Sequence, residues 1–224
     1  MITKTIFYIN PNTLTIENIS THLCEASELR IDAISLTIML NIYSHLRSYT
    51  HRIAKVKINR RSFDFTSDAS LLFPEWERNG INIFCIGGMS AESEKFKKIL
   101  KNRYPRLQIE VFDGYDKTNE DIIISKLKAN SILVIGLGSP LQELLALRIA
   151  KLNVCDEIYT CGGFISQTAA SGGVYYPKII DTLNLRWLWR IIKEPHVLKR
   201  FISKYPAGLL QSYNFHTRFN HLVK

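Results

Sequence analysis

Residues 131–148 read SILVIGLGSPLQELLALR, an apolar run of strand length followed by a glycine loop and a helix-forming stretch. The run 132–135 is apolar without alternation, which predicts a strand buried on both faces of a parallel sheet. Gly136 and Gly138 allow positive φ and a close approach of another backbone. The stretch therefore predicts a strand, loop and helix of an α/β domain.

The residues after this loop predict how the helix begins. Ser139 is a candidate N-cap, Pro140 suits the first helical position and Gln142 completes a capping box. Unpaired N–H groups at such a helix end attract phosphate or another anion. The pattern is neither G-x-G-x-x-G nor a P-loop, and an ordinary βα turn is the alternative interpretation.

The rest of residues 5–170 repeats the alternation of strand and helix. Strands are predicted at 5–10, 80–88, 107–112 and 157–161, with helices at 16–29, 119–128 and after Ser90. This order predicts a Rossmann-like, mostly parallel sheet with helices on both faces and a ligand crevice at the carboxyl ends of the strands. Glycines that would converge there are Gly87, Gly88, Gly114, Gly136, Gly138, Gly162 and Gly163.

Composition is that of a folded protein with an uneven charge. The 224 residues are 46% hydrophobic and 22% charged, with a net charge of +9. Eight Lys or Arg and a single Glu between Arg186 and Lys224 leave +7 in that segment. We expect an α/β catalytic domain at 1–180 and a basic, aromatic, helical C-terminal appendage at 181–224.

The mixture of basic and aromatic residues in this appendage suits an anionic lipid surface. A nucleic-acid surface and a plain solvated helix face are the alternatives from composition alone. The chain shows no signal peptide and no apolar run of about 18 residues, so we expect a cytoplasmic protein.

The segments Gly136-Leu137-Gly138-Ser139-Pro140 and Gln142-Glu143 form a GxGSPxQE pattern. It resembles the signature of the WecG/TagA/CpsF glycosyltransferases (glycosyltransferase family 26), which include teichoic-acid linkage-unit, common-antigen and capsular-polysaccharide transferases. Residues 185–190, LRWLWR, with Glu194-Pro195 resemble a second block of that family. The resemblance spans roughly residues 10–200.

The resemblance implies the site residues. Asp32, in Ile31-Asp32-Ala33-Ile34, matches the catalytic base, although helix capping is its alternative role. Arg61 matches a further catalytic arginine, with a solvated surface pair as the alternative. Glu143 would accept hydrogen bonds from sugar or ribose hydroxyls, or only cap its helix. The expected substrate-binding residues are Asn10, Gly87, Gly88, Gly114, Tyr115, Gly136, Gly138, Ser139, Pro140, Gln142, Glu143, Gly163, Arg190, Lys199 and Arg200.

The chain also departs from the family pattern. Residues 162–177 read GGFISQTAASGGVYYP, with Ser166 where the family has aspartate and Tyr175-Tyr176 before Pro177, and Val197 stands where an arginine is expected. These departures favour an alternative function, a catalytically inactive homologue that binds nucleotide-sugar or partners in a polysaccharide assembly complex.

The resemblance implies an inverting glycosyltransferase of bacterial surface polysaccharide biosynthesis. It would move a sugar from a UDP-sugar to a polyprenyl-diphosphate-linked sugar, as a peripheral protein on the inner face of the plasma membrane. The chain lacks an Asp-x-Asp motif, so we expect no metal, and we expect no cofactor and no nucleic-acid partner. Assembly into a homo-oligomer is left open.

Overall fold

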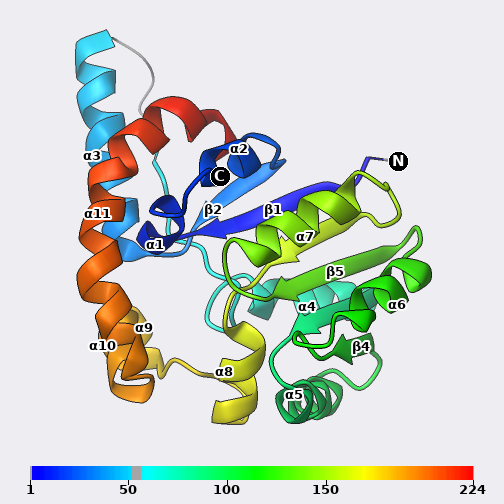
Figure 1. Cartoon of the computed structure of the whole chain (residues 1–224). Helices are drawn as coiled ribbons and strands as arrows, with labels where there is room; N and C mark the ends of the chain where they lie inside the picture. Colours follow the sequence, from blue (N-terminus) through cyan, green and yellow to red (C-terminus); the bar gives the residue numbers. More distant parts are fainter. Residues whose placement is uncertain (1, 52–56, 224) are drawn as a thin grey trace. The chain divides into compact units, whose positions relative to one another are not determined.

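The computed structural model describes residues 2–51 and 57–223 and shows an α/β protein with a six-stranded parallel sheet (Figure 1). The strand order is β2-β1-β6-β5-β3-β4, and the predicted Rossmann-like fold is confirmed. The strands are β1 (Lys4–Ile9), β2 (Glu28–Ile31), β3 (Asn82–Gly87), β4 (Gln108–Phe112), β5 (Ser131–Gly136) and β6 (Glu157–Thr160).

The central strand β5 forms where the apolar run predicted it. Residues 131–135 are all buried, as expected for a strand with neighbours on both edges and helices on both faces. Its register pairs Ile132 with Ile83 of β3 and with Glu157 of β6. The strand ends Gly87 and Gly136 are therefore direct neighbours.

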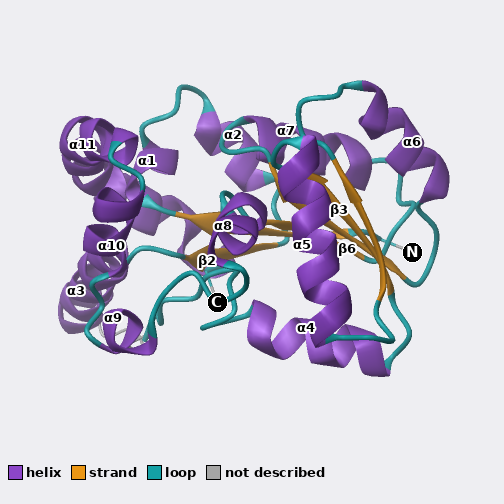
Figure 2. Cartoon of the chain, turned by 90° about the horizontal axis from the view of Figure 1, so that it is seen from below, coloured by secondary structure: helices purple, strands orange, loops and turns teal. Residues whose placement is uncertain are grey.

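The chain divides into two compact units. The sheet unit comprises Met1–Phe7 and Ser62–Tyr175, and the helical unit comprises Tyr8–Arg61 and Tyr176–Lys224. In the sheet unit, α6 and α7 lie on one side of the strands and α4 on the other (Figure 2). The helices of this unit are α4 (Ala69–Arg78), α5 (Ser90–Arg103), α6 (Thr118–Lys126), α7 (Leu141–Ala150) and α8 (Phe164–Ser171).

Aromatic rings fill the space between β6 and helices α4, α5 and α8. Phe164 of α8 is at its centre, within 6.3 Å of four other rings. Rings of this size bury large apolar areas, so the cluster fixes α8 and the loop before it. Its members are Phe63, Phe65, Phe73, Trp76, Phe96, Tyr104, Tyr159 and Phe164.

The helical unit contains β2, the end of β1 and helices from both ends of the chain. The long helices α3 and α11 pack against each other, with Tyr43 and Tyr213 in edge-to-face contact at 5.4 Å between ring centroids. Its helices are α1 (Pro11–Leu14), α2 (Ile19–Cys24), α3 (Ile34–His51), α9 (Lys178–Thr182), α10 (Arg186–Lys193), α11 (His196–Phe219) and the 3-10 turn η1 (Asn220–Leu222).

The prediction of one helix over 16–29 is wrong. The segment forms the short helix α2 and then β2, whose residues Leu29 to Ile31 are buried. Four residues are too few for a pattern to separate strand from helix, and pairing decides the outcome. Residues 52–56 lie outside the described chain, and Arg60, shortly after them, forms an isolated parallel bridge with Ile31.

The C-terminal helices group with residues 8–61 in the helical unit. On α11, Gly208, Ser212, Phe215 and Phe219 are buried, and α11 packs closely on α1. The last third of α11 is therefore part of the core of the helical unit.

Candidate functional site

Glycines end β3 and β5 and closely follow β4 and β6, which are neighbouring strands of the sheet unit. A Cβ atom built on Gly87 would lie 2.6 Å from the carbonyl oxygen of Gly136, and one on Gly136 would lie 2.8 Å from that of Gly162. A Cβ on Gly114 would lie 2.8 Å from the Cα of Gly87. Such distances exclude side chains, so close backbone approach requires glycine here. The predicted convergence of glycine-bearing strand ends is confirmed, and we call this set, with Gly88, the glycine rim.

The glycine rim lies where the chain reverses its direction across the sheet. From β3 the chain passes through α5 to β4 on one side, and from β5 it passes through α7 to β6 on the other. Ligands of open α/β sheets bind at such a switch point, outside the carboxyl ends of the strands. The reversal falls between Gly87 and Gly136.

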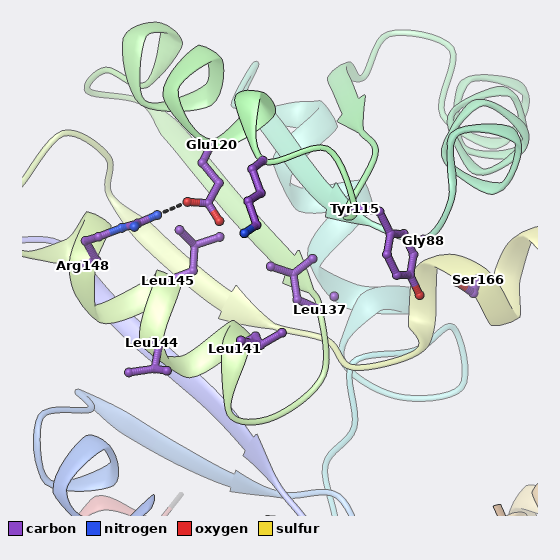
Figure 3. Close-up of a pocket in the computed structure, with 12 residues that line it drawn as sticks. Gly88, Tyr115, Glu120, Leu137, Leu141, Leu144, Leu145, Arg148 and Ser166 are labelled. Atoms are coloured by element: carbon purple, nitrogen blue, oxygen red, sulfur yellow. Dashed lines mark hydrogen bonds and ion pairs between the residues drawn. The ribbon is translucent and has the colours of Figure 1, made fainter. Parts of the chain in front are cut away.

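A pocket of about 670 Å³ opens at this point (Figure 3). Its volume suits a ligand of nucleotide-sugar size. Arg148 and Glu120 form an ion pair at one wall, and Tyr115, 79% exposed, lies at the other end. The lining residues are Gly88, Gly114, Tyr115, Lys117, Glu120, Gly136, Leu137, Leu141, Leu144, Leu145, Arg148 and Ser166.

The GxGSPxQE residues form a buried hydrogen-bond network instead of the predicted helix cap. The Ser139 hydroxyl donates to Glu143 Oε1 at 2.7 Å, and Gln142 Nε2 donates to the same oxygen at 3.0 Å. Gln142 Oε1 accepts from the backbone N–H of Gly162 at 3.1 Å. The helix starts at Leu141 with Pro140 as N-cap, so the capping box is a wrong prediction.

This network joins the loop after β5 to the loop after β6. Glu143 is 0% exposed, and its Oε1 accepts hydrogen bonds from Ser139 and Gln142. This oxygen therefore holds the loop after β5 in place from the protein interior. Gly138 has φ of +76° with open space around it, whereas Gly136 does not adopt positive φ and is required for close approach. The signature thus fixes backbone beside the pocket.

Three further predicted residues have defined neighbours in the sheet unit. Gly114 donates its N–H to the carbonyl of Gly88 at 2.9 Å, which joins the loops after β4 and β3. Tyr115 follows, with its N–H bonded to the Asp113 carboxylate at 2.7 Å. Gly163 precedes α8, and its carbonyl accepts from the Gln167 N–H at 2.8 Å.

Pattern reasoning missed a carboxylate at this rim. Ser166 on α8 donates its hydroxyl proton to Glu92 Oε2 of α5 at 2.9 Å. The same oxygen accepts from the backbone N–H of Met89 at 2.8 Å. A Cβ atom on Gly88 would lie 3.0 Å from it. The only sequence signal is the position of Glu92 in the first turn of a helix that follows a glycine pair.

In the helical unit, Asp32 lies between the end of β2 at Ile31 and the start of α3 at Ile34. It is half-buried, and its N–H donates to the carbonyl of Ile9 at the end of β1 at 2.9 Å. The neighbouring strands therefore fix the backbone of the expected base at the carboxyl end of the sheet.

Tyr205 lies within electrostatic range of this carboxylate and of two arginines, Arg190 and Arg200. Burial raises the pKa of the Tyr205 phenol, Arg190 lowers it, and Asp32 raises it through like-charge repulsion. Burial opposes the charge of Arg190, but Tyr176 and Glu194 raise its pKa above the usual value. These charges therefore lie within electrostatic range of one ring.

Arg190 is also incompletely paired within the described residues. Its Nη2 contacts Glu194 Oε2 at 3.3 Å, while its Nε is buried without a hydrogen-bond partner there. Desolvation lowers the pKa of Arg200, and the nearby charge of Arg190 lowers it further. A pair of neighbouring cations with a buried donor suits an anionic ligand. Lys199, one residue before, is exposed.

The remaining predicted residues of this unit have structural contacts. Asn10 caps α1 by accepting from the Thr13 N–H at 3.3 Å. The Arg61 N–H donates to the carbonyl of Ile31 at 2.8 Å, and its guanidinium lies 3.9 Å from Glu28 Oε1. Arg61 therefore lies beside the end of β2. It bonds to Ile31, the residue that precedes Asp32.

The described residues contain neither a cluster of metal ligands nor a membrane-spanning helix. Across residues 2–51 and 57–223, no three or more His, Cys, Asp or Glu side chains are grouped so that they could hold a metal ion. In the same ranges, no helix combines the length and the apolar character needed to cross a bilayer.

Comparison with known proteins finds a matching family model and curated relatives. Residues 49–220 match the family model of the glycosyl transferase WecG/TagA/CpsF family. The chain is also 39% identical over 159 residues to UDP-Gal:alpha-D-GlcNAc-diphosphoundecaprenol beta-1,4-galactosyltransferase of Shigella boydii. That alignment covers 69% of this chain and 67% of the relative.

Proposed function

The chain belongs to the glycosyl transferase WecG/TagA/CpsF family, and from this premise we propose that it moves a sugar from a UDP-sugar to a polyprenyl-diphosphate-linked sugar. Glycosyl transfer is the activity of the family, and the Shigella boydii relative is named for a UDP-galactose donor and a diphosphoundecaprenol-linked acceptor. The observation that carries the choice of donor is the pocket at the glycine rim, because it occupies the nucleotide position of an open parallel sheet.

The donor nucleotide takes the pocket of the sheet unit in this proposal. Gly88 and Gly136 line this pocket, and the close packing that these glycines allow sets the shape of its wall. Leu137, Leu141 and Leu145 supply apolar surface for a base or sugar ring.

Asp32 is the base in this proposal, and Arg190 and Arg200 carry the positive charge. Asp32 accepts the proton of the acceptor hydroxyl, whose oxygen bonds to the anomeric carbon while the bond from that carbon to UDP breaks. UDP leaves with the electron pair, and attack from the opposite face inverts the configuration. Arg190 and Arg200 stabilise diphosphate charge, with the buried Nε of Arg190 as a donor.

The C-terminal helices provide the membrane contact in this proposal. Trp187, Ile192 and Ile202 are exposed apolar side chains on α10 and α11. Exposed cations alternate with them along the sequence, among them Lys193 and Lys204. Interfacial helices combine these features, with the cations on anionic headgroups and the apolar side chains at the acyl boundary. The surface would place the enzyme on the leaflet that holds its acceptor.

The test is transfer of radiolabelled galactose or N-acetylglucosamine from UDP to a GlcNAc-diphosphate-lipid with a short, water-soluble chain. We expect a product with inverted anomeric configuration, and we expect turnover to persist in EDTA. Binding of UDP-sugar without transfer to any acceptor in a lipid extract would instead favour the catalytically inactive homologue. Ser166 and the buried Val197 are the observations in favour of that alternative, since both replace charged residues of the family pattern.

A further inference from the structure

We propose that Ser166 is a donor-recognition residue, whose oxygen accepts a hydrogen bond from a hydroxyl of the nucleotide-sugar, and that Glu92 is the positioning residue that holds Ser166 in this acceptor state. The inference rests on the proposed function, because it takes a UDP-sugar as the ligand of the pocket. It assigns a role to the serine that stands where the family pattern has aspartate.

The geometry fixes the carboxylate first. Glu92 Oε2 accepts from the Met89 N–H at 2.8 Å and from the Ser166 hydroxyl at 2.9 Å. The first contact anchors the carboxylate at the N-terminus of α5, where the helix dipole favours a negative charge. The second joins α5 to α8, the helix held by the aromatic cluster. Both partners of the Ser166 to Glu92 contact are therefore on rigid elements.

This contact determines what Ser166 offers to the pocket it lines. A serine hydroxyl has one proton to donate and two lone pairs, whereas an ionised carboxylate can only accept. The proton of Ser166 therefore points to Glu92, and only lone pairs remain for a ligand. The serine oxygen, polarised by a neighbouring anion, becomes a better acceptor.

A ligand group at this position must be a hydrogen-bond donor. A phosphate oxygen would meet serine lone pairs and the nearby negative charge of Glu92, which is unfavourable on both counts. A hydroxyl of the ribose or of the transferred sugar has a proton to donate. The family pattern has a carboxylate at position 166. In this chain Glu92 of α5 supplies a carboxylate that contacts the side chain at that position.

Calorimetric titration with UDP, UDP-galactose and UDP-N-acetylglucosamine tests the proposal. Ser166→Ala should weaken binding by roughly 5- to 30-fold, the usual effect of one lost hydrogen bond in a site. A loss for both UDP-sugars but not for UDP would assign the bond to the transferred sugar. An equal loss for all three ligands would assign it to the ribose. Ser171→Ala, an exposed serine at the end of the same helix, is the matched control.

A second set of variants tests the role of Glu92. Glu92→Gln can still accept from Met89 but lets the serine proton turn away, so it should weaken the same ligands as Ser166→Ala, by less. The double variant Glu92→Gln, Ser166→Asp moves the carboxylate into the pocket and should restore binding. The control is Glu94→Gln, an exposed residue of the same helix.

The outcomes separate this inference from the proposed function. Wild-type affinity of Ser166→Ala for every probe would overturn the inference and leave the proposed function standing. A wild-type protein that binds none of the three probes would overturn both. If Ser166→Ala loosens α8, the double variant decides alone, because failure to recover binding while folded contradicts the acceptor role.

Discussion

Gly208→Ala tests whether the end of α11 is a core element of the helical unit. Gly208 faces α1, and a Cβ atom there would collide with the carbonyl oxygen of Pro11. The same atom would lie 2.5 Å from the Pro11 carbonyl carbon and 2.9 Å from its Cα. Ordinary carbon contacts are about 3.5–4.0 Å, so the helices must separate by roughly 1 Å.

Two effects of opposite sign set the magnitude. Alanine is favoured over glycine in a helix by about 1 kcal/mol. Overpacking costs about 1–3 kcal/mol, and the upper value applies here because the colliding atoms are backbone and cannot change rotamer. Asn10 also holds α1 in place through its cap to Thr13. We therefore expect a net loss of about 2 kcal/mol.

Scanning calorimetry should show this loss as a fall in Tm of about 4–8 °C for a chain of this size. Gln211→Ala, at an exposed position one turn further along α11, is the matched control and should stay within about 0.5 kcal/mol of wild type. A Gly208→Ala protein with unchanged or higher Tm would show that helix propensity wins. It would also refute the close packing of α11 on α1.

The other predictions concern the site and the membrane contact. Asp32→Asn should keep UDP-sugar affinity while turnover falls by roughly 10² to 10⁴, the range for loss of a positioned base; near-normal turnover would leave Asp32 with a structural role only. Ser139→Ala removes the bond to Glu143 and should lower the free energy of unfolding by about 1.5–3 kcal/mol in urea titrations, with weaker UDP binding; unchanged stability would contradict the network. Lys204→Glu should weaken binding to anionic vesicles by roughly 30-fold at low salt while Lys98→Glu on α5 does not, and equal effects would remove the C-terminal helices from the membrane contact.

The sequence predicted the sheet unit well because its signals are local. Residues 131–136 and 82–87 are apolar runs of strand length that end in glycine, and the structure forms β5 and β3 there. Glycines at strand ends in a βα alternation must meet on one edge of a parallel sheet, whatever the strand order. The glycine rim could therefore be predicted before any tertiary contact was known.

The helical unit was harder to predict because long-range contacts define it. β2 has four residues and becomes a strand through pairing, as shown by Arg61, whose N–H binds the carbonyl of Ile31. For the basic, aromatic C-terminal segment, composition suits an anionic lipid surface, with a nucleic-acid surface and a solvated helix face as alternatives. Phe215 and Phe219 are instead buried in the unit, while Ile202 stays exposed. Composition cannot distinguish a buried helix face from a membrane-binding one, since both need apolar side chains at helical spacing.

The residues of the GxGSPxQE signature predict a helix cap, but in the structure they form a hydrogen-bond network between two loops. Its residue types suit a capping box, and an isolated peptide with this sequence would have no better partner for Ser139. In the folded chain, the Gly162 N–H from the next loop needs an acceptor, and Gln142 supplies it. Glu143, which is itself 0% exposed, then holds Gln142 and Ser139 together. The hydrogen bonds of Glu143 and Gln142 thus control the position of the backbone beside the pocket. Substitutions at 139, 142 and 143 should therefore change ligand binding by moving this loop, and not by removing a direct contact with the ligand.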